Sequence, residues 1–230
     1  MTKAVLIDFD DTLCYTNSVF TRVREEYNEI MRSWGLWDED LNRVMNDFDV
    51  ANVNALGHFS TSCFPDAFGQ AYEEYCRKYN QSFDQIKFDE VVELGYSVFS
   101  KPIELLPGAT ELLEGLKSEY KLFLVTHGDI DSQRQRIARS GINNYFDNIY
   151  ILEKKTKEEY EKIIAENAVD KSFSWMVGNS LRYDVALSME AGLHAIHLDS
   201  DSWDFDHWEI EGEYSTANSL TEVLQIIKEA

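Results

Sequence analysis

The segment Lys3-Ala-Val-Leu-Ile-Asp8-Phe9-Asp10-Asp11-Thr12-Leu13 ends an apolar run with paired acidic side chains. Residues 4–7 are all apolar and are followed by turn-forming residues, which predicts a short strand buried in a parallel sheet. Because side chains alternate along a strand, Asp8 and Asp10 can point into one site just past its carboxyl end. There one carboxylate can attack a substrate while the other handles a proton. The alternative is a strand that ends in a solvated turn, since Asp and Thr favour turns.

The composition is that of a folded globular protein. The chain has 230 residues, of which 44% are hydrophobic and 13% aromatic, enough for one core and a smaller second unit. No apolar run approaches the roughly 20 residues that span a bilayer, and the N-terminus lacks a signal-peptide pattern. The three cysteines are far apart and lack metal-ligand spacing, which indicates reduced thiols and a cytoplasmic protein.

The charge balance is strongly acidic, with a formal net charge of -21 and a pI near 4.5. Such a field repels nucleic acid and anionic lipid, so we expect neither nucleic acid nor a membrane as a partner. It does not favour phosphate substrates either. If the substrate is a phosphate, the site must supply its own cations.

The stretch from residue 15 to residue 102 is predicted to be a helical unit inserted after the first strand. Apolar residues recur there at helical spacing in four segments: 18–34, 38–48, 66–79 and 89–100. The irregular segment 52–65 is predicted to be a loop between helices. Its His58, Ser60 and Ser62 are candidates for reaching a leaving group, although a loop packed on its own helices is the favoured interpretation.

From residue 106 onward, helices and strands alternate. The pattern predicts strands at 121–125, 148–152, 174–177 and 195–198, separated by helices, with a last helix at 220–229. Thr156 and Glu159 form a capping-box pattern, and Gly141 suits a left-handed helix end. Alternation of this kind implies a parallel sheet covered by helices, with ligands at the carboxyl ends of the strands. We expect an α/β fold with a Rossmann-like core domain (1–14 and 103–230) and an inserted α-helical cap domain (15–102) that acts as a lid.

Three further polar signals follow predicted strands. Thr126-His127-Gly128 offers a hydroxyl and free backbone N–H groups that can hold phosphate oxygens. The alternative is that the segment only caps a helix. The pair Lys154-Lys155 can neutralise a phosphoryl group, or be a solvated loop charge. Gly178-Asn179-Ser180, followed by Asp184, offers oxygen ligands for a hard cation such as Mg²⁺, or an Asx turn.

These four signals, in this order, resemble the four motifs of the haloacid dehalogenase-like (HAD) superfamily, whose first motif is Asp-x-Asp-x-Thr/Val. The likeness spans nearly the whole chain, including the helical insert. It implies that Asp8 is the nucleophile and Asp10 the general acid and base, so that the catalytic set is Asp8, Asp10, Thr126 and Lys155. The implied substrate-binding set is Asp11, Thr126, His127, Gly128 and Lys155. The implied Mg²⁺ ligands are Asp8, Asp10 (through its backbone carbonyl), Asn179 and Asp184. Lys155 is preferred over Lys154 on the family's spacing from Phe146-Asp147.

Two residues depart from the family pattern. Asn179 stands where the family usually has Asp, which removes a formal charge from the metal site and makes Asp184 more important. Asp11 replaces a frequent glycine, and that change says little about the substrate.

The resemblance implies a Mg²⁺-dependent phosphatase that hydrolyses a small phosphorylated metabolite through an aspartyl-phosphate. A 2-haloacid dehalogenase is disfavoured, because the family's dehalogenases lack the second aspartate. A phosphotransferase or mutase remains open, as does a catalytically inactive binding protein on the same fold. The acidic segment Asp199–Asp206 superficially resembles a calcium loop, but it lacks that motif's obligatory glycine, and a solvated surface loop is favoured.

Overall fold

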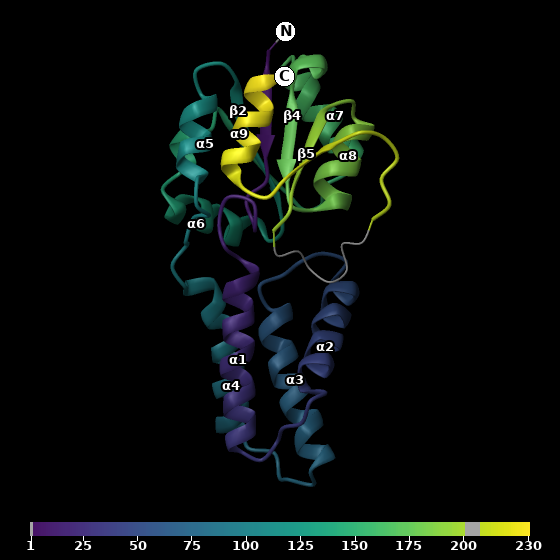
Figure 1. The fold of residues 1–230 in the computed structure, drawn as a ribbon. Coiled ribbons are helices and arrows are strands. Elements are labelled where there is room, and N and C mark those ends of the chain that lie inside the picture. Colours follow the sequence, from purple (N-terminus) through teal and green to yellow (C-terminus); the bar gives the residue numbers. More distant parts are fainter. Residues whose placement is uncertain (1, 201–207) are drawn as a thin grey trace. The chain divides into compact units, whose positions relative to one another are not determined.

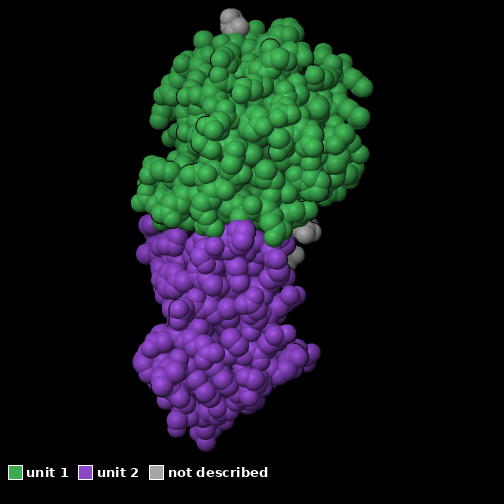
Figure 2. Space-filling view, turned by 90° about the vertical axis from the view of Figure 1, so that its left-hand side faces the viewer, with its two compact units in different colours: residues 1–17, 103–230 green, residues 18–102 purple. Residues whose placement is uncertain are grey.

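The computed structural model describes residues 2–200 and 208–230, and the chain divides into two compact units, 1–17 with 103–230 and 18–102 (Figures 1 and 2). The first, here called the core unit, carries a six-stranded sheet. Its strands are β1 (Ala4–Ile7), β2 (Lys121–His127), β3 (Asn148–Leu152), β4 (Trp175–Gly178), β5 (His194–Leu198) and β6 (Ser215–Ala217). Within these described residues no helix is long and apolar enough to cross a membrane.

The sheet order is β3-β2-β1-β4-β5-β6, and each pairing between neighbours is parallel. Strand β1 is therefore central, between β2 and β4, although a helical unit separates it from β2 in the sequence. All four of its residues are buried, as expected for a strand covered on both faces. This topology confirms the predicted α/β class with a Rossmann-like parallel sheet.

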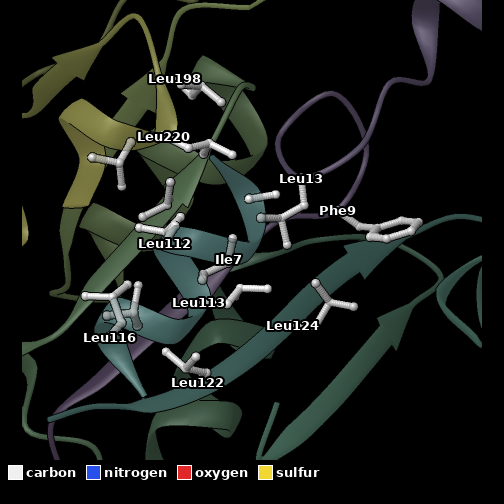
Figure 3. Close-up of a cluster of buried hydrophobic side chains, with 14 of the residues drawn as sticks. Ile7, Phe9, Leu13, Leu112, Leu113, Leu116, Leu122, Leu124, Leu198 and Leu220 are labelled. Atoms are coloured by element: carbon white, nitrogen blue, oxygen red, sulfur yellow. The ribbon is translucent and has the colours of Figure 1, made fainter. Parts of the chain in front are cut away.

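Helices cover both faces of the sheet. They are α5 (Ala109–Leu116), α6 (Ile130–Ser140), α7 (Lys157–Glu166), α8 (Leu187–Glu190) and α9 (Leu220–Glu229). Val5 and Ile7 of β1 share a buried cluster with leucines of α5 and α9 (Figure 3), whereas Ala4 and Leu6 share another with Tyr160 of α7. This division follows from the alternation of side chains along a strand. Gly141 ends α6 with φ 77°, the left-handed conformation expected there.

The helical unit, residues 18–102, has a core of its own. Its helices are α1 (Asn17–Ser33), α2 (Leu41–Leu56), α3 (Cys63–Lys78) and α4 (Gln85–Ser97), followed by the 3₁₀ turn η1 (Val98–Ser100). Aromatic side chains form a large part of this core, and the ring centroid of Phe68 lies 4.3 Å from that of Tyr27 and 4.7 Å from that of Phe64, both in tilted arrangements. The aromatic content of this region therefore serves packing between helices.

The interpretation of segment 52–65 as a loop is wrong for most of its length. Helix α2 continues to Leu56 and α3 begins at Cys63, so that residues 57–62 form the connection. The inward face of α2 includes Asp49, which is only 8% exposed. A buried carboxylate in that position interrupts the apolar spacing, and the pattern consequently hid the second half of the helix.

Other elements also differ from the sequence prediction. Strand β2 extends through Thr126 to His127, which pair with Ile151 and Leu152 of β3. The segment Leu181–Ala186 (η4) is a π-helical turn before α8 rather than part of one α-helix. Strand β6 was missed, because three residues in a polar segment give no detectable period.

Candidate active site

The carboxyl ends of β2, β1 and β4 meet at one edge of the sheet. Asp8 directly follows β1, and its backbone N–H donates to the carbonyl of Val177 in β4 at 2.9 Å. Thr126 lies near the end of β2 and Asn179 follows β4. The parallel order therefore gathers residues of three of the four sequence motifs at the edge where α/β sheets bind ligands.

Lys155 supplies the fourth group. Its Nζ donates to Asp8 Oδ1 and to Asp184 Oδ1, each at 2.6 Å, and its side chain is 1% exposed. It directly precedes Thr156, whose side chain accepts the backbone N–H of Glu159 and caps α7. The neighbouring Lys154 is exposed. Of the two lysines, Lys155 is thus the one that contacts the carboxylates.

The buried pairing shifts the pKa values of these groups. Burial raises the pKa of Asp8 to about 7, while the Lys155 ammonium acts in the opposite direction. Burial alone would lower the pKa of Lys155, but the carboxylates of Asp184 and Asp8 raise it above its ordinary value. Lys155 is therefore a permanent cation at neutral pH, fixed against the predicted nucleophile.

Thr12 links Asp8 to the β4 motif from the other side. Its fully buried hydroxyl donates to Asp8 Oδ2 at 3.0 Å and lies 3.4 Å from Asn179 Oδ1. The hydroxyl oxygen of Thr12 also accepts the backbone N–H of Asn179 at 3.2 Å. This explains the threonine of the first motif, which orients the second carboxylate oxygen of Asp8 toward the Asn179 amide.

Gly178 makes room for Asp184. A Cβ on Gly178 would lie 2.2 Å from Asp184 Oδ2, far inside van der Waals contact. That carboxylate oxygen also accepts the backbone N–H of Ser180 at 3.0 Å. The glycine is thus required because η4 folds the carboxylate of Asp184 back over the end of β4.

The donor chemistry around Asp8 fits a magnesium ion. The described residues contain no cluster of three His, Cys, Asp or Glu side chains that could hold a metal. The carboxylates of Asp8 and Asp184 are joined through Lys155, and the Thr12 hydroxyl links Asp8 to the neutral oxygen of Asn179. Hard cations prefer such oxygen ligands. With the Asp10–Arg136 ion pair included, the carboxylates at this site outnumber the cations Lys155 and Arg136, and a divalent cation would offset the excess negative charge.

Asp10 lies in a polar network that the sequence did not predict. Arg136 of α6 forms an ion pair with its Oδ1, which also accepts the hydroxyl of Thr16 at 2.7 Å. The amide of Gln133 donates to its Oδ2 at 2.5 Å. Burial alone would raise the pKa of Asp10, but Arg136 and these hydrogen bonds lower it below its ordinary value. One signal was present in the sequence: Gln133 shares the inward face of α6 with Ile137, four residues away.

The Thr126-His127-Gly128 segment lies beside this network. Thr126 is 1% exposed, and its hydroxyl accepts the Gln133 amide at 2.9 Å. The ring of His127 lies 5.2 Å from that of Tyr183, and burial lowers its pKa to about 4. Gly128 has φ 138°, outside the range of most side chains. His127 is therefore neutral at pH 7, and the substrate-binding role of the three residues stays a prediction.

Asp11 has contacts of another kind. It has φ 54°, and its carboxylate accepts the backbone N–H groups of Thr16 and Asn17, each at 2.9 Å. Burial raises its pKa to about 6. Its backbone carbonyl accepts the hydroxyl of Ser200 at 2.7 Å. These contacts brace the loop after β1, and its role in substrate binding stays a prediction.

The remaining candidates lie elsewhere. In the helical unit, His58 contacts the carbonyl of Leu56, and Ser60 bonds to Ser62 at 3.3 Å, as expected for a connection packed on its own helices. Of the acidic segment 199–206, only Asp199 and Ser200 belong to the described residues, and the comparison with a calcium loop lies outside them.

Comparison with known proteins agrees with this geometry. The haloacid dehalogenase-like hydrolase family matches residues 2–192, which includes all four motifs. The chain belongs to the haloacid dehalogenase-like hydrolases. The HAD resemblance inferred from the motifs is thereby confirmed, and the protein is a hydrolase by family.

Individual relatives are distant. N-acylneuraminate-9-phosphatase of Mus musculus is 26% identical over 84% of this chain and 80% of its own length. Glyceraldehyde 3-phosphate phosphatase of Methanothermobacter thermautotrophicus is 24% identical over 99% of this chain and 100% of its own. A family hydrolase from Xanthomonas campestris has a similar fold, with a TM-score of 0.77 at 20% identity over 99% and 95% of the two chains. YfnB of Bacillus subtilis, solved bound to magnesium, has a TM-score of 0.65 at 17% identity over 98% of each chain.

Proposed function

We propose that the protein is a Mg²⁺-dependent phosphatase that hydrolyses a small phosphorylated metabolite through an aspartyl-phosphate on Asp8. The observation that carries the proposal is the buried contact of Lys155 with both Asp8 and Asp184. A permanent cation fixed beside a carboxylate allows that carboxylate to approach an anionic phosphoryl group. The phosphatase names of both relatives support this reaction.

The proposed reaction has two steps. An Asp8 oxygen attacks phosphorus, the bond to the leaving oxygen breaks, and Asp10 gives that oxygen a proton. Asp10 then takes a proton from a water molecule, whose oxygen attacks phosphorus and restores the free Asp8 carboxylate. Thr126 and Lys155 hold the phosphoryl oxygens. Bound Mg²⁺, held by Asp8, the Asp10 carbonyl, Asn179 and Asp184, would stabilise negative charge on the phosphoryl group.

The substrate class follows from charge and from the relatives. The names of both relatives specify small phosphorylated metabolites, and a chain of net charge -21 disfavours polyanions such as nucleic acid. We propose that the helical unit, residues 18–102, is the cap that selects the substrate. A cytoplasmic location is proposed on the three cysteines, all of which are free and buried.

Dehalogenation is the less favoured reaction, because a halide leaves without protonation. Asp10 would then have no task, yet its carboxylate is held by Arg136, Gln133 and Thr16. General acid–base catalysis needs a side chain in a fixed position, and these contacts fix the carboxylate of Asp10.

The test uses purified full-length protein with p-nitrophenyl phosphate and a panel of sugar phosphates. We expect turnover with Mg²⁺, its loss in excess chelator, and its abolition by Asp8→Asn, because an amide cannot accept the phosphoryl group. Folding of the variant is checked by circular dichroism. Undiminished turnover by Asp8→Asn, or by the wild type in chelator, would overturn the proposal.

A further inference from the structure

Arg136 is an immobilised cation rather than a surface charge. Its Nη1 contacts Asp10 Oδ1 and lies 2.8 Å from Gln133 Oε1, and its Nη2 donates to the Thr16 hydroxyl at 2.7 Å. Its guanidinium lies 5.3 Å from the centre of the Phe9 ring, and 14% of the side chain is exposed. These neighbours, together with Cys14 Sγ at 3.9 Å from Nη2, fix the guanidinium in position and orientation.

Arg134, on the same helix, shows the contrasting case. It pairs with Asp131 at 2.8 Å, but the two side chains are 67% and 83% exposed. An exposed pair of this kind contributes about 0–1 kcal/mol and fixes no geometry. Burying Arg136 beside Asp10 costs desolvation free energy. A contribution to folding stability is therefore a weak explanation for this buried ion pair.

The two oxygens of Asp10 have different surroundings. Oδ1 is held by Arg136 and by Thr16, whereas Oδ2 contacts the Gln133 amide. That amide also lies 2.9 Å from the hydroxyl of Thr126, the residue expected to hold the phosphoryl group. With Oδ1 anchored, Oδ2 lies on the side of the Gln133 amide and Thr126, where the phosphoryl group is expected.

We propose that Arg136 is a positioning residue that anchors Asp10 Oδ1 and so presents Oδ2 to the leaving oxygen. The inference rests on the proposed function. As the bond from phosphorus to the leaving oxygen breaks, that oxygen takes the proton of Asp10 Oδ2, and the resulting carboxylate is stabilised by Arg136 and Gln133. Water returns a proton to Asp10 in the second step.

The experiment compares a good and a poor leaving group. Turnover of p-nitrophenyl phosphate and of an alkyl phosphate is compared as kcat/KM, which depends on the steps up to release of the leaving group and not on hydrolysis of the shared intermediate. The proteins are the wild type, Arg136→Met, Asp10→Asn and the double variant, with Arg134→Met as the matched control. We expect Arg136→Met to lower kcat/KM for the alkyl phosphate by about 10- to 100-fold, part of the usual contribution of general acid catalysis. Its effect on kcat/KM for the aryl phosphate should stay below about threefold, since that leaving group needs little protonation.

The double variant tests whether Arg136 affects catalysis through Asp10. If Arg136 acts through Asp10, Arg136→Met should change alkyl phosphate turnover less than about threefold in the Asp10→Asn background. Equal losses for both esters, or an undiminished loss in that background, would overturn the proposal. Arg134→Met should leave both rates unchanged.

Folding and function are separated by two controls. Circular dichroism and thermal melting establish that each variant is folded. If Arg136→Met does not fold, Arg136→Lys replaces it, with a smaller loss expected that still depends on the leaving group and on Asp10. A wild type that hydrolyses neither ester would overturn the phosphatase proposal and this one together. An active wild type with leaving-group-independent losses would overturn the positioning role alone.

Discussion

Replacing Lys155 with Met isolates the contribution of one buried cation. The ammonium forms ion pairs of 2.6 Å with Asp8 and with Asp184, and the three side chains are 1–7% exposed. Met preserves most of the volume and removes the charge. The variant therefore keeps the packing around α7 while leaving two carboxylates buried without a counter-charge.

The magnitude follows from that burial. Removing one partner of a buried ion pair typically costs about 3–5 kcal/mol, a large part of the roughly 5–15 kcal/mol that stabilises a folded domain. Burial already raises the pKa of Asp8, and without the Lys155 ammonium, which acts in the opposite direction, the pKa of Asp8 rises further above its unfolded value. A carboxylate with a raised pKa disfavours the folded state increasingly as pH rises. The deficit should therefore be larger at pH 8 than at pH 5.

Urea unfolding in metal-free buffer at both pH values measures this effect. The matched control is Lys154→Met, because Lys154 is exposed and adjacent; its stability should stay within about 0.5 kcal/mol of wild type. Turnover of folded Lys155→Met should fall by at least about 10²- to 10³-fold, the usual cost of one charge-stabilising donor. A Lys155→Met variant as stable and active as Lys154→Met, or one relatively more stable at pH 8, would show that Lys155 does not neutralise these buried carboxylates.

Three other variants test separate contacts. Asn179→Asp restores a carboxylate beside Asp8 and should bind Mg²⁺ at least as tightly as wild type by calorimetry; weaker binding would contradict its role as a ligand. Gly178→Ala places a Cβ 2.2 Å from Asp184 Oδ2, and should destabilise by about 1–3 kcal/mol and lower Mg²⁺ affinity; a wild-type melting temperature would count against the contact. Asp38 accepts hydrogen bonds from Lys78 and nearby tyrosines, and these hold its pKa below the ordinary value. Such a group stabilises above its unfolded pKa of about 4 and loses this effect as pH falls. Asp38→Asn should thus lower stability by up to about 1 kcal/mol at pH 7 and less at pH 3; a pH-independent difference would contradict the ion-pair origin.

The first motif and its partners were predictable because local pattern and geometry agree there. A buried strand at residues 4–7 fixes where Asp8 emerges, and the parallel sheet brings the ends of its neighbours to it. The choice of Lys155 over Lys154 came from family spacing, and no local pattern distinguishes the two residues.

The support around Asp10 was not predictable from the motifs. Gln133 and Arg136 are polar residues of a helix whose inward orientation is set by tertiary packing, and polar residues at helical spacing ordinarily indicate a solvated face. Asp49 shows the same difficulty in the helical unit, where a buried carboxylate concealed half of α2. In both places, a polar side chain lies on the inward face of a helix, where the sequence pattern predicts an apolar one.

The aspartyl-phosphate on Asp8 is tested most directly by detecting the phosphoryl group on the chain. Asp10→Asn should slow hydrolysis of the intermediate more than its formation from an aryl phosphate, because only hydrolysis then depends on proton abstraction by residue 10. The variant is mixed with p-nitrophenyl phosphate and Mg²⁺, quenched in acid, digested and analysed by mass spectrometry. We predict one phosphoryl group on Asp8, absent when Asp8 is also replaced by Asn. Turnover without a phosphorylated Asp8, or a phosphoryl group on another residue, would contradict the account.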